Sequence, residues 1–450
     1  NHFFSQLSWR LDFLSYLCDV FLCDKAQYLT MGIMIIQRPL YLRKLISRRH
    51  NGMIKIVTGV RRCGKSFLLS TLYAGWLREQ GVENDHIITI NLEDRRNRKL
   101  RDPDALLDYI DSKLTDDAVH YIMIDEIQHV SEFEDVLNSY LNMPNADVYV
   151  TGSNARFLSK DVITTFRGRG DEIKLYPLSF GEVFPYMDLQ KDRALNTYML
   201  FGGLPQVVQK SSEEEKNEYL KGLFTHTYIK DIKERYSIKN IEMLDELLNI
   251  LASDIGTLTN PTKLTNTFES VKHTKVNRMT LTSYLEYICD SFLVEKASRY
   301  DVKGKRYIDS PYKYYFTDCG LRNALLNFRQ TEPSHLMENV IYNELRVRGF
   351  NVDVGVVPVQ LRKEDGSRER KQFEVDFVCN MGSRRYYIQS AYRMPDEEKM
   401  KQEEASLRNI DDSFKKIIIV GEDTPVLRNE AGITTIGIYD FLLNENSLDL

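Results

Sequence analysis

A glycine-rich loop between a strand and a helix constrains the fold of this chain more than any other feature. The segment Ile54–Val57 is largely apolar and β-branched, which is typical of a buried strand. The residues GVRRCGKS follow, and they fit the pattern G-x-x-x-x-G-K-[ST]. Apolar residues then recur at helical spacing. The order strand, loop and helix predicts an α/β sheet with a phosphate site at the start of the helix.

The loop offers several groups that suit a nucleoside triphosphate. Gly59 and Gly64 let the main chain turn so that its N–H groups face phosphate oxygens. Lys65 would contact the β- and γ-phosphates, and Ser66 would give its hydroxyl to Mg²⁺. The residues expected to bind ATP are Gly59, Val60, Arg61, Arg62, Cys63, Gly64, Lys65, Ser66 and Phe67. The alternative is a chance glycine turn before a core helix, which the flanking pattern disfavours.

Two acids end a later apolar strand. The segment Tyr121–Ile124 is followed directly by Asp125 and Glu126. In phosphate-loop enzymes, the acid that ends such a strand helps to hold Mg²⁺. A following glutamate can act as a base toward the attacking water. We therefore expect Asp125 to bind the metal and Glu126 to activate water. The alternative is a pair of helix-capping acids, but the distance of about sixty residues from Lys65 favours the catalytic interpretation.

Two further segments hold groups that could act on the terminal phosphate. The predicted strand Ala146–Thr151 runs into Ser153 and Asn154, whose polar side chains could sense the γ-phosphate. The next turn holds Arg167 and Arg169, and guanidinium groups stabilise phosphoryl charge from the same chain or from a neighbouring subunit. The alternatives are an ordinary strand exit and a solvated basic turn.

Composition limits the other classes of function. At 450 residues the chain exceeds one usual hydrophobic core, which predicts several domains. The net charge of −5 gives no overall basic character, so any contact with nucleic acid needs a local patch. The six cysteines include no C-x-x-C pair. This pattern disfavours a disulfide framework or a cysteine zinc site and predicts a cytoplasmic setting.

The first 33 residues read as an accessory extension. The chain begins with Asn1, and residues 8–23 are apolar but interrupted by Asp12 and Asp19. This stretch is too short and too polar for a membrane span. We therefore expect no membrane association.

Five sequence strings together resemble one protein family. They are GVRRCGKS, IMIDEIQ, TGSNA, FRGRGDEIKLYPLSFGE and YMLFGGLPQVV. These strings are similar to those of bacterial and archaeal AAA-type ATPases with a fused C-terminal domain of unknown function. The resemblance runs from Ile36 to the end of the chain. It implies an ATPase core of five parallel strands with flanking helices, a winged-helix segment and a nuclease-like C-terminal domain.

These features predict an α/β fold with four parts. After the extension 1–33, residues 34–190 would form a P-loop NTPase domain with a parallel sheet. Residues 191–325 would form a helical linker and winged-helix segment, and residues 326–450 an α+β domain like a restriction endonuclease. The polar start of the second helix in the winged-helix pattern could contact DNA, or the module could contact another protein.

The last domain carries a weak metal-site pattern. Glu338 on a helix, Asp376 on a strand and Gln389 on the next strand occupy positions where a restriction-endonuclease fold holds metal ligands. The lysine that this motif needs falls on Ala391. A fold retained for contacts is therefore favoured over cleavage. Further on, residues 415–421 and 434–438 look like edge strands.

The sequence as a whole predicts an ATPase that uses Mg²⁺ and whose nucleotide state controls C-terminal contact modules. Two alternatives stay open at this point. One is a slow-turnover switch that binds DNA or protein, and the less favoured one is a nuclease. A homo-oligomer is compatible with either function.

Overall fold

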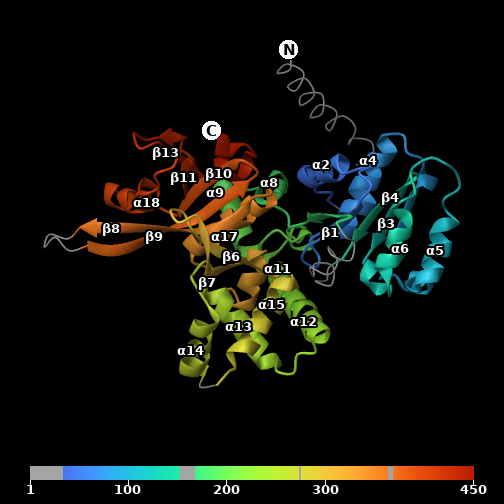
Figure 1. Cartoon of the computed structure of the whole chain (residues 1–450), viewed down its shortest axis with the longest axis horizontal. Helices are drawn as coiled ribbons and strands as arrows, with labels where there is room; N and C mark the ends of the chain where they lie inside the picture. The colour runs from blue at the N-terminus through green and yellow to red at the C-terminus, as the bar shows by residue number, and fades with distance from the viewer. Residues whose placement is uncertain (1–33, 153–167, 273–274, 363–367) are drawn as a thin grey trace, which may run out of the picture. The chain divides into compact units, whose positions relative to one another are not determined.

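The computed structural model describes residues 34–152, 168–272, 275–362 and 368–450 (Figure 1). Contacts divide the described chain into two compact units. Unit 1 comprises residues 34–57, 65–152 and 168–173, and unit 2 comprises residues 58–64 and those from 174 onward. In the part of the chain that the structure describes, no helix has both the length and the apolar character that a bilayer crossing requires.

The first sheet has five strands in the order β2-β3-β4-β1-β5. They are β1 (Ile54–Thr58), β2 (Ile87–Asn91), β3 (His120–Asp125), β4 (Ala146–Thr151) and β5 (Gly170–Lys174). The pairs β2–β3, β3–β4 and β1–β4 are parallel. All residues of β1 are buried, as expected for a strand covered on both faces. The parallel five-stranded sheet implied by the resemblance is confirmed.

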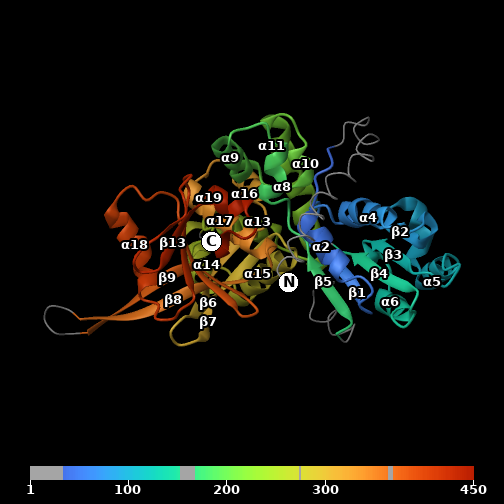
Figure 2. The ribbon, with the colours of Figure 1, turned by 90° about the horizontal axis from the view of Figure 1, so that it is seen from above.

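Helices flank this sheet. They are α2 (Pro39–Ser47), α3 (Lys65–Phe67), α4 (Ala74–Glu79), α5 (Pro103–Asp111) and α6 (Phe133–Tyr140). A π-helical segment, η1 (Leu68–Tyr73), joins α3 to α4, and its leucines are buried. In Figure 2, β3 and β4 lie between α4 and α6. The apolar residues that recur after the glycine loop therefore lie on the buried face of one continuous helical segment.

The parallel register brings three strand ends together at one edge of the sheet. Ile124 pairs with Val150, and Val57 pairs with Thr151. The carboxyl ends of β1, β3 and β4 therefore meet at the same edge, where ligands bind in open parallel sheets. The amino ends of β2 and β3 meet at the opposite edge, since Ile87 pairs with Tyr121.

Residues 180–325 of unit 2 are mainly helical. Their helices are α8 (Phe180–Val183), α9 (Lys191–Phe201), α10 (Pro205–Val208), α11 (Glu213–Leu223), α12 (Ile229–Tyr236), α13 (Ile241–Ser253), α14 (Pro261–Lys272), α15 (Arg278–Asp290) and α16 (Cys319–Leu325). Two of the strings behind the family resemblance touch here. The Leu178 N–H of PLSFGE donates to the Gly203 carbonyl of GGLP at 2.8 Å. A Cβ atom on Gly203 would lie 2.0 Å from the Leu178 carbonyl oxygen, so only glycine fits.

We expect Gly203→Ala to destabilise unit 2 by about 1–3 kcal/mol, because the new methyl group overpacks a rigid main-chain contact. Gly222→Ala is the matched control. Gly222 lies in α11 with no atom within 4 Å of an added Cβ, so alanine should stabilise the helix slightly. Urea unfolding followed by far-UV circular dichroism measures both changes. Equal stability of the two variants would contradict the packing argument.

The second sheet has eight strands in the order β12-β13-β11-β10-β9-β8-β6-β7. They are β6 (Val294–Asp301), β7 (Arg306–Phe316), β8 (Asn351–Arg362), β9 (Arg368–Met381), β10 (Arg384–Ala391), β11 (Lys415–Val420), β12 (Leu427–Arg428) and β13 (Ile433–Gly437). The accompanying helices are α17 (Pro333–Val347), α18 (Glu397–Arg408) and α19 (Ile438–Leu443).

Two features of this sheet differ from the sequence-based expectation. Residues 415–421 and 434–438 were expected at sheet edges, but β11 lies between β10 and β13, and the short β12 lies outside β13. The run Ile417–Ile419 is fully buried, which suits an interior strand. The hairpin β6–β7 follows α14 and α15 in the expected order, yet β6 pairs with β8. The hairpin therefore joins strands on both sides of the expected boundary at residue 325.

Candidate functional site

The glycine loop adopts main-chain angles that favour glycine. Gly59 has φ of 141° and Gly64 has φ of 99°, both in the left-handed region. A Cβ atom on Gly59 would also lie 2.1 Å from the Leu175 carbonyl oxygen. Helix α3 begins at Lys65, directly after the loop. The strand, tight turn and helix expected from the sequence are therefore all present.

Ser66 and Asp125, the two residues expected to bind Mg²⁺, are in contact within unit 1. The Ser66 hydroxyl donates to the Asp125 carboxylate, with distances of 2.9 and 2.8 Å to its two oxygens. The Thr151 hydroxyl donates to Asp125 Oδ1 at 2.5 Å. Burial raises the pKa of Asp125, and the hydrogen bonds from Thr151 and Ser66 oppose that rise. This edge of the sheet thus gathers hydroxyl and carboxylate oxygens, the ligand type that Mg²⁺ prefers.

Glu126 follows in a strained conformation. Its φ is 54°, which is uncommon for a residue other than glycine, and such strain tends to occur at functional sites. Its N–H group donates to Thr151 Oγ1 at 3.0 Å. Its side chain is buried, and the Gln128 amide donates to its carboxylate. Lys65 is also buried.

Two residues of this site were not among the sequence candidates. Thr151 contacts both Asp125 and the main chain of Glu126, and Gln128 contacts the Glu126 side chain. Thr151 could have been chosen for its hydroxyl, because it ends the predicted strand that runs into the candidates Ser153 and Asn154. No local sequence signal separates Gln128 from other polar residues that follow a strand.

Residues 58–64 of the loop belong to unit 2, and some of their side chains contact other residues of that unit. Val60 and Cys63 are buried, and the Cys63 thiol lies 3.6 Å from the Leu175 carbonyl oxygen. Arg61 Nη1 donates to both carboxylate oxygens of Asp231 on α12, at 2.8 and 2.6 Å. The Tyr228 hydroxyl donates to the Arg61 carbonyl at 2.7 Å. Because their side chains are engaged in this way, Val60, Arg61 and Cys63 would contact a phosphate through their main-chain groups.

The other phosphate-sensing candidates are placed only in part. Ser153, Asn154 and Arg167 lie outside the described residues. The Arg169 carbonyl accepts the Ile54 N–H at 2.9 Å, at the start of β1. The glycine loop follows the other end of that strand, so this position does not support action of Arg169 within its own chain. Action in a neighbouring subunit stays a prediction.

The weak metal candidates of the last domain surround a lysine. Lys313 on β7 is buried, and its Nζ lies 2.9 Å from Glu338 and from Glu374, and 3.4 Å from Asp376. Gln389 Oε1 accepts the main-chain N–H of Asp376 at 3.4 Å. Among the described residues, these carboxylates do not form a metal-binding group. An ammonium group thus lies among these acids, and metal binding by Glu338, Asp376 and Gln389 stays a prediction.

Comparisons with known proteins agree with the first sheet and its loop. The model of a family described as "AAA domain" matches residues 51–184, and that of a domain of unknown function (DUF8612) matches residues 192–332. An uncharacterized protein from Haemophilus influenzae is 33% identical over 422 residues, which cover 92% of this chain and all of that protein. The chain belongs to this family of AAA-domain proteins. An uncharacterized protein from Methanocaldococcus jannaschii is 29% identical over 371 residues, which cover 80% of this chain and 79% of that protein.

Solved structures resemble this AAA-domain protein only distantly. Cdc6p from Pyrobaculum aerophilum is 12% identical, covers 68% of this chain and 96% of its own, and gives a TM-score of 0.28. The Aeropyrum pernix ORC1 protein in complex with DNA is 12% identical, with coverages of 65% and 93% and a TM-score of 0.29. The ADP form of the ORC2 protein of the same organism is 10% identical, with coverages of 59% and 88% and a TM-score of 0.33. These TM-scores do not establish a common fold.

Proposed function

We propose that this AAA-domain protein binds ATP and hydrolyses it with Mg²⁺. The observation that carries the proposal is the contact between the Ser66 hydroxyl and the Asp125 carboxylate at 2.9 and 2.8 Å. Ser66 is the last residue of the glycine-loop motif. Asp125 is the last residue of β3, which lies in the same sheet as β1, the strand that leads into the loop. A serine, an aspartate and a lysine of this kind hold Mg²⁺ and phosphate in phosphate-loop enzymes, which supports the proposal.

Each residue has a separate role in this proposal. The main-chain N–H groups of Gly59–Gly64 and the Lys65 ammonium would bind phosphate oxygens. Ser66 and Asp125 would hold Mg²⁺, which when bound neutralises charge on the β- and γ-phosphates. Glu126 would accept a proton from the attacking water. Asn154, Arg167 and Arg169 stay candidates for sensing or stabilising the γ-phosphate.

The contacts of Glu126 favour a second candidate function, the slow-turnover switch. The carboxylate is buried and accepts a hydrogen bond from the Gln128 amide. This hydrogen bond stabilises the ionised carboxylate and so lowers its tendency to accept a proton from water. A protein that keeps its base in this arrangement would hold ATP for long periods, and its bound state would be the signal.

We also infer that nucleotide occupancy is passed to the C-terminal modules through Arg61. Its paired hydrogen bonds to Asp231 connect the phosphate loop to α12. Helices α14 and α15 and the hairpin β6–β7 have the order of a winged helix. At the start of α15, Met279 is 78% exposed next to the exposed Arg278. This surface would contact DNA or a partner protein.

Nucleotide binding by a Lys65→Ala variant tests the proposal. Loss of the ammonium should weaken ATP binding at least about tenfold, equal to about 1.4 kcal/mol. Lys99→Ala is the control, because Lys99 is an exposed lysine of the same unit. Calorimetric titration with MgATP measures both variants. Equal affinity of Lys65→Ala and the unmodified protein would remove the proposed site.

A further inference from the structure

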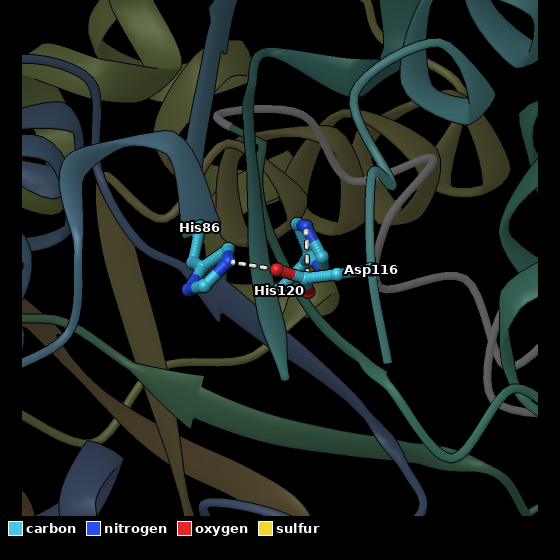
Figure 3. Close-up of side chains that lie close together, drawn as sticks. All are labelled: His86, Asp116 and His120. Atoms are coloured by element: carbon cyan, nitrogen blue, oxygen red, sulfur yellow. Dashed lines mark hydrogen bonds and ion pairs between the residues drawn. The ribbon is translucent and has the colours of Figure 1, made fainter. Parts of the chain in front are cut away.

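Three metal-ligating side chains lie together at the amino edge of the first sheet (Figure 3). His86 ends the short helix η2 (Asn84–His86) just before β2, and His120 is the first residue of β3. Asp116 lies in the segment that leads into β3. The next residues along each strand, Ile87 and Tyr121, are paired in the sheet. The strand register therefore places the two histidines side by side.

The three side chains present one ligand atom each toward a common point. His86 Nε2 lies 3.0 Å from Asp116 Oδ2, and His120 Nε2 lies 4.0 Å from Asp116 Oδ1. The centroids of the two imidazole rings are 4.6 Å apart. One ligand atom from each residue falls within 4.8 Å of the other two. A small cation can contact all three groups after minor side-chain rotation.

His120 supplies the observation that points to a bound cation. The side chain is 0% exposed, and Nδ1 lies 2.8 Å from the Ala118 carbonyl oxygen, to which it can only donate a hydrogen. Nε2 is then left with a lone pair. This buried nitrogen has no hydrogen-bond partner among the described residues. A buried polar atom without a partner is costly, and a cation at this point would satisfy it.

Hydrogen bonds from neighbouring groups hold the three side chains in place, as is common around metal ligands. A ligating histidine usually donates its second N–H to a carbonyl, as His120 does to Ala118. The Ala118 N–H donates to Asp116 Oδ1 at 2.9 Å. The Asn145 side-chain amide donates to the Asp116 main-chain carbonyl at 3.1 Å, and the Asn145 main-chain carbonyl accepts the His120 main-chain N–H at 2.8 Å. Loop and strand are thereby fixed around the ligand atoms.

We propose that His86, Asp116 and His120 bind a divalent transition-metal ion, for which Zn²⁺ is the best match. Two imidazole nitrogens and one carboxylate oxygen suit Zn²⁺, whereas Mg²⁺ and Ca²⁺ prefer oxygen ligands alone. The Asp116 side chain is 52% exposed, so an ion can enter from solvent. His120 and Asp125 are the opposite ends of β3. The ion would therefore lie at the opposite end of β3 from the proposed phosphate site. It would connect the starts of β2 and β3.

Zinc titration of the full chain tests this site. The titration is done by calorimetry without nucleotide and with excess Mg²⁺, which occupies oxygen-rich sites. Asp116→Asn and His86→Ala should each weaken Zn²⁺ binding about tenfold or more, since even the loss of an outer-shell partner costs 10- to 100-fold. His129→Ala is the matched control, because His129 is an exposed histidine of the same unit.

The substitutions of the exposed Asp116 and the partly buried His86 carry less risk of misfolding than a change of the fully buried His120. At a Zn²⁺ concentration close to the dissociation constant of the unmodified protein, the melting temperature of the unmodified protein and of His129→Ala should rise clearly more than that of Asp116→Asn. Failure of the unmodified protein to bind Zn²⁺ would overturn the proposal, and so would equal binding by Asp116→Asn. Lys65→Ala should bind Zn²⁺ normally, so this result is independent of ATP binding.

Discussion

Replacement of Glu126 by glutamine is expected to lower the rate of ATP hydrolysis by about 10²- to 10⁴-fold, the usual contribution of a positioned general base. The amide of glutamine has nearly the same volume but cannot accept a proton from water. ATP binding should persist, because Ser66 and Lys65 are unchanged. Phosphate release under single-turnover conditions measures hydrolysis, and nucleotide titration measures binding.

Glu132→Gln is the matched control for this experiment. Glu132 also follows β3, also has a positive φ, of 52°, and is exposed. Its substitution should leave the rate unchanged. Undiminished hydrolysis by Glu126→Gln would remove the base assignment. A very low rate in the unmodified protein itself would instead favour the slow-turnover switch.

Replacement of Lys313 by methionine is expected to destabilise unit 2 by about 3–5 kcal/mol, the usual cost of removing one partner from a buried ionic cluster. Methionine keeps most of the side-chain length but leaves Glu338, Glu374 and Asp376 without their cation. Urea unfolding followed by far-UV circular dichroism measures this change.

The penalty should depend on pH in a defined direction. Burial raises the pKa of Asp376 to about 7, even though Lys313 lowers it. The stability that this carboxyl group contributes is therefore full below its ordinary pKa of 3.8 and is lost as the pH rises through about 7. Without Lys313 the ionised form becomes still less favourable. The loss of stability in Lys313→Met should thus be smaller near pH 5 than near pH 8.

Lys296→Met is the control for this change, because Lys296 is an exposed lysine on the neighbouring strand β6. Its effect should stay within about 0.5 kcal/mol. A loss of stability by Lys313→Met that is equal at both pH values would contradict the electrostatic explanation and leave only a packing effect.

Local sequence signals were sufficient for the phosphate loop and for Asp125. The loop needs glycine at fixed positions, and the acid directly ends an apolar strand, so each feature is visible within a few residues. The contact between Ser66 and Asp125 also follows, since strands of one parallel sheet end at the same edge.

The parts that were missed depend on pairing between distant segments. Lys313 and Asp376 are 63 residues apart in sequence, and only the second sheet brings them together. The motif predicts a lysine after Asp376, where Ala391 stands, whereas the lysine beside these acids lies on the earlier hairpin strand β7. The same applies to β6 and β8, whose pairing crosses the expected boundary. Interior and edge strands also differ in their neighbours more than in their composition.

The register of β3 limits which insertions and deletions this chain can tolerate. It has six residues, with His120 first and Asp125 last. A slip of one residue would turn every side chain of the strand to the opposite face. Insertions and deletions within β3 should therefore be strongly selected against in the lineage, whereas the surface segments that precede and follow it can vary in length at small cost.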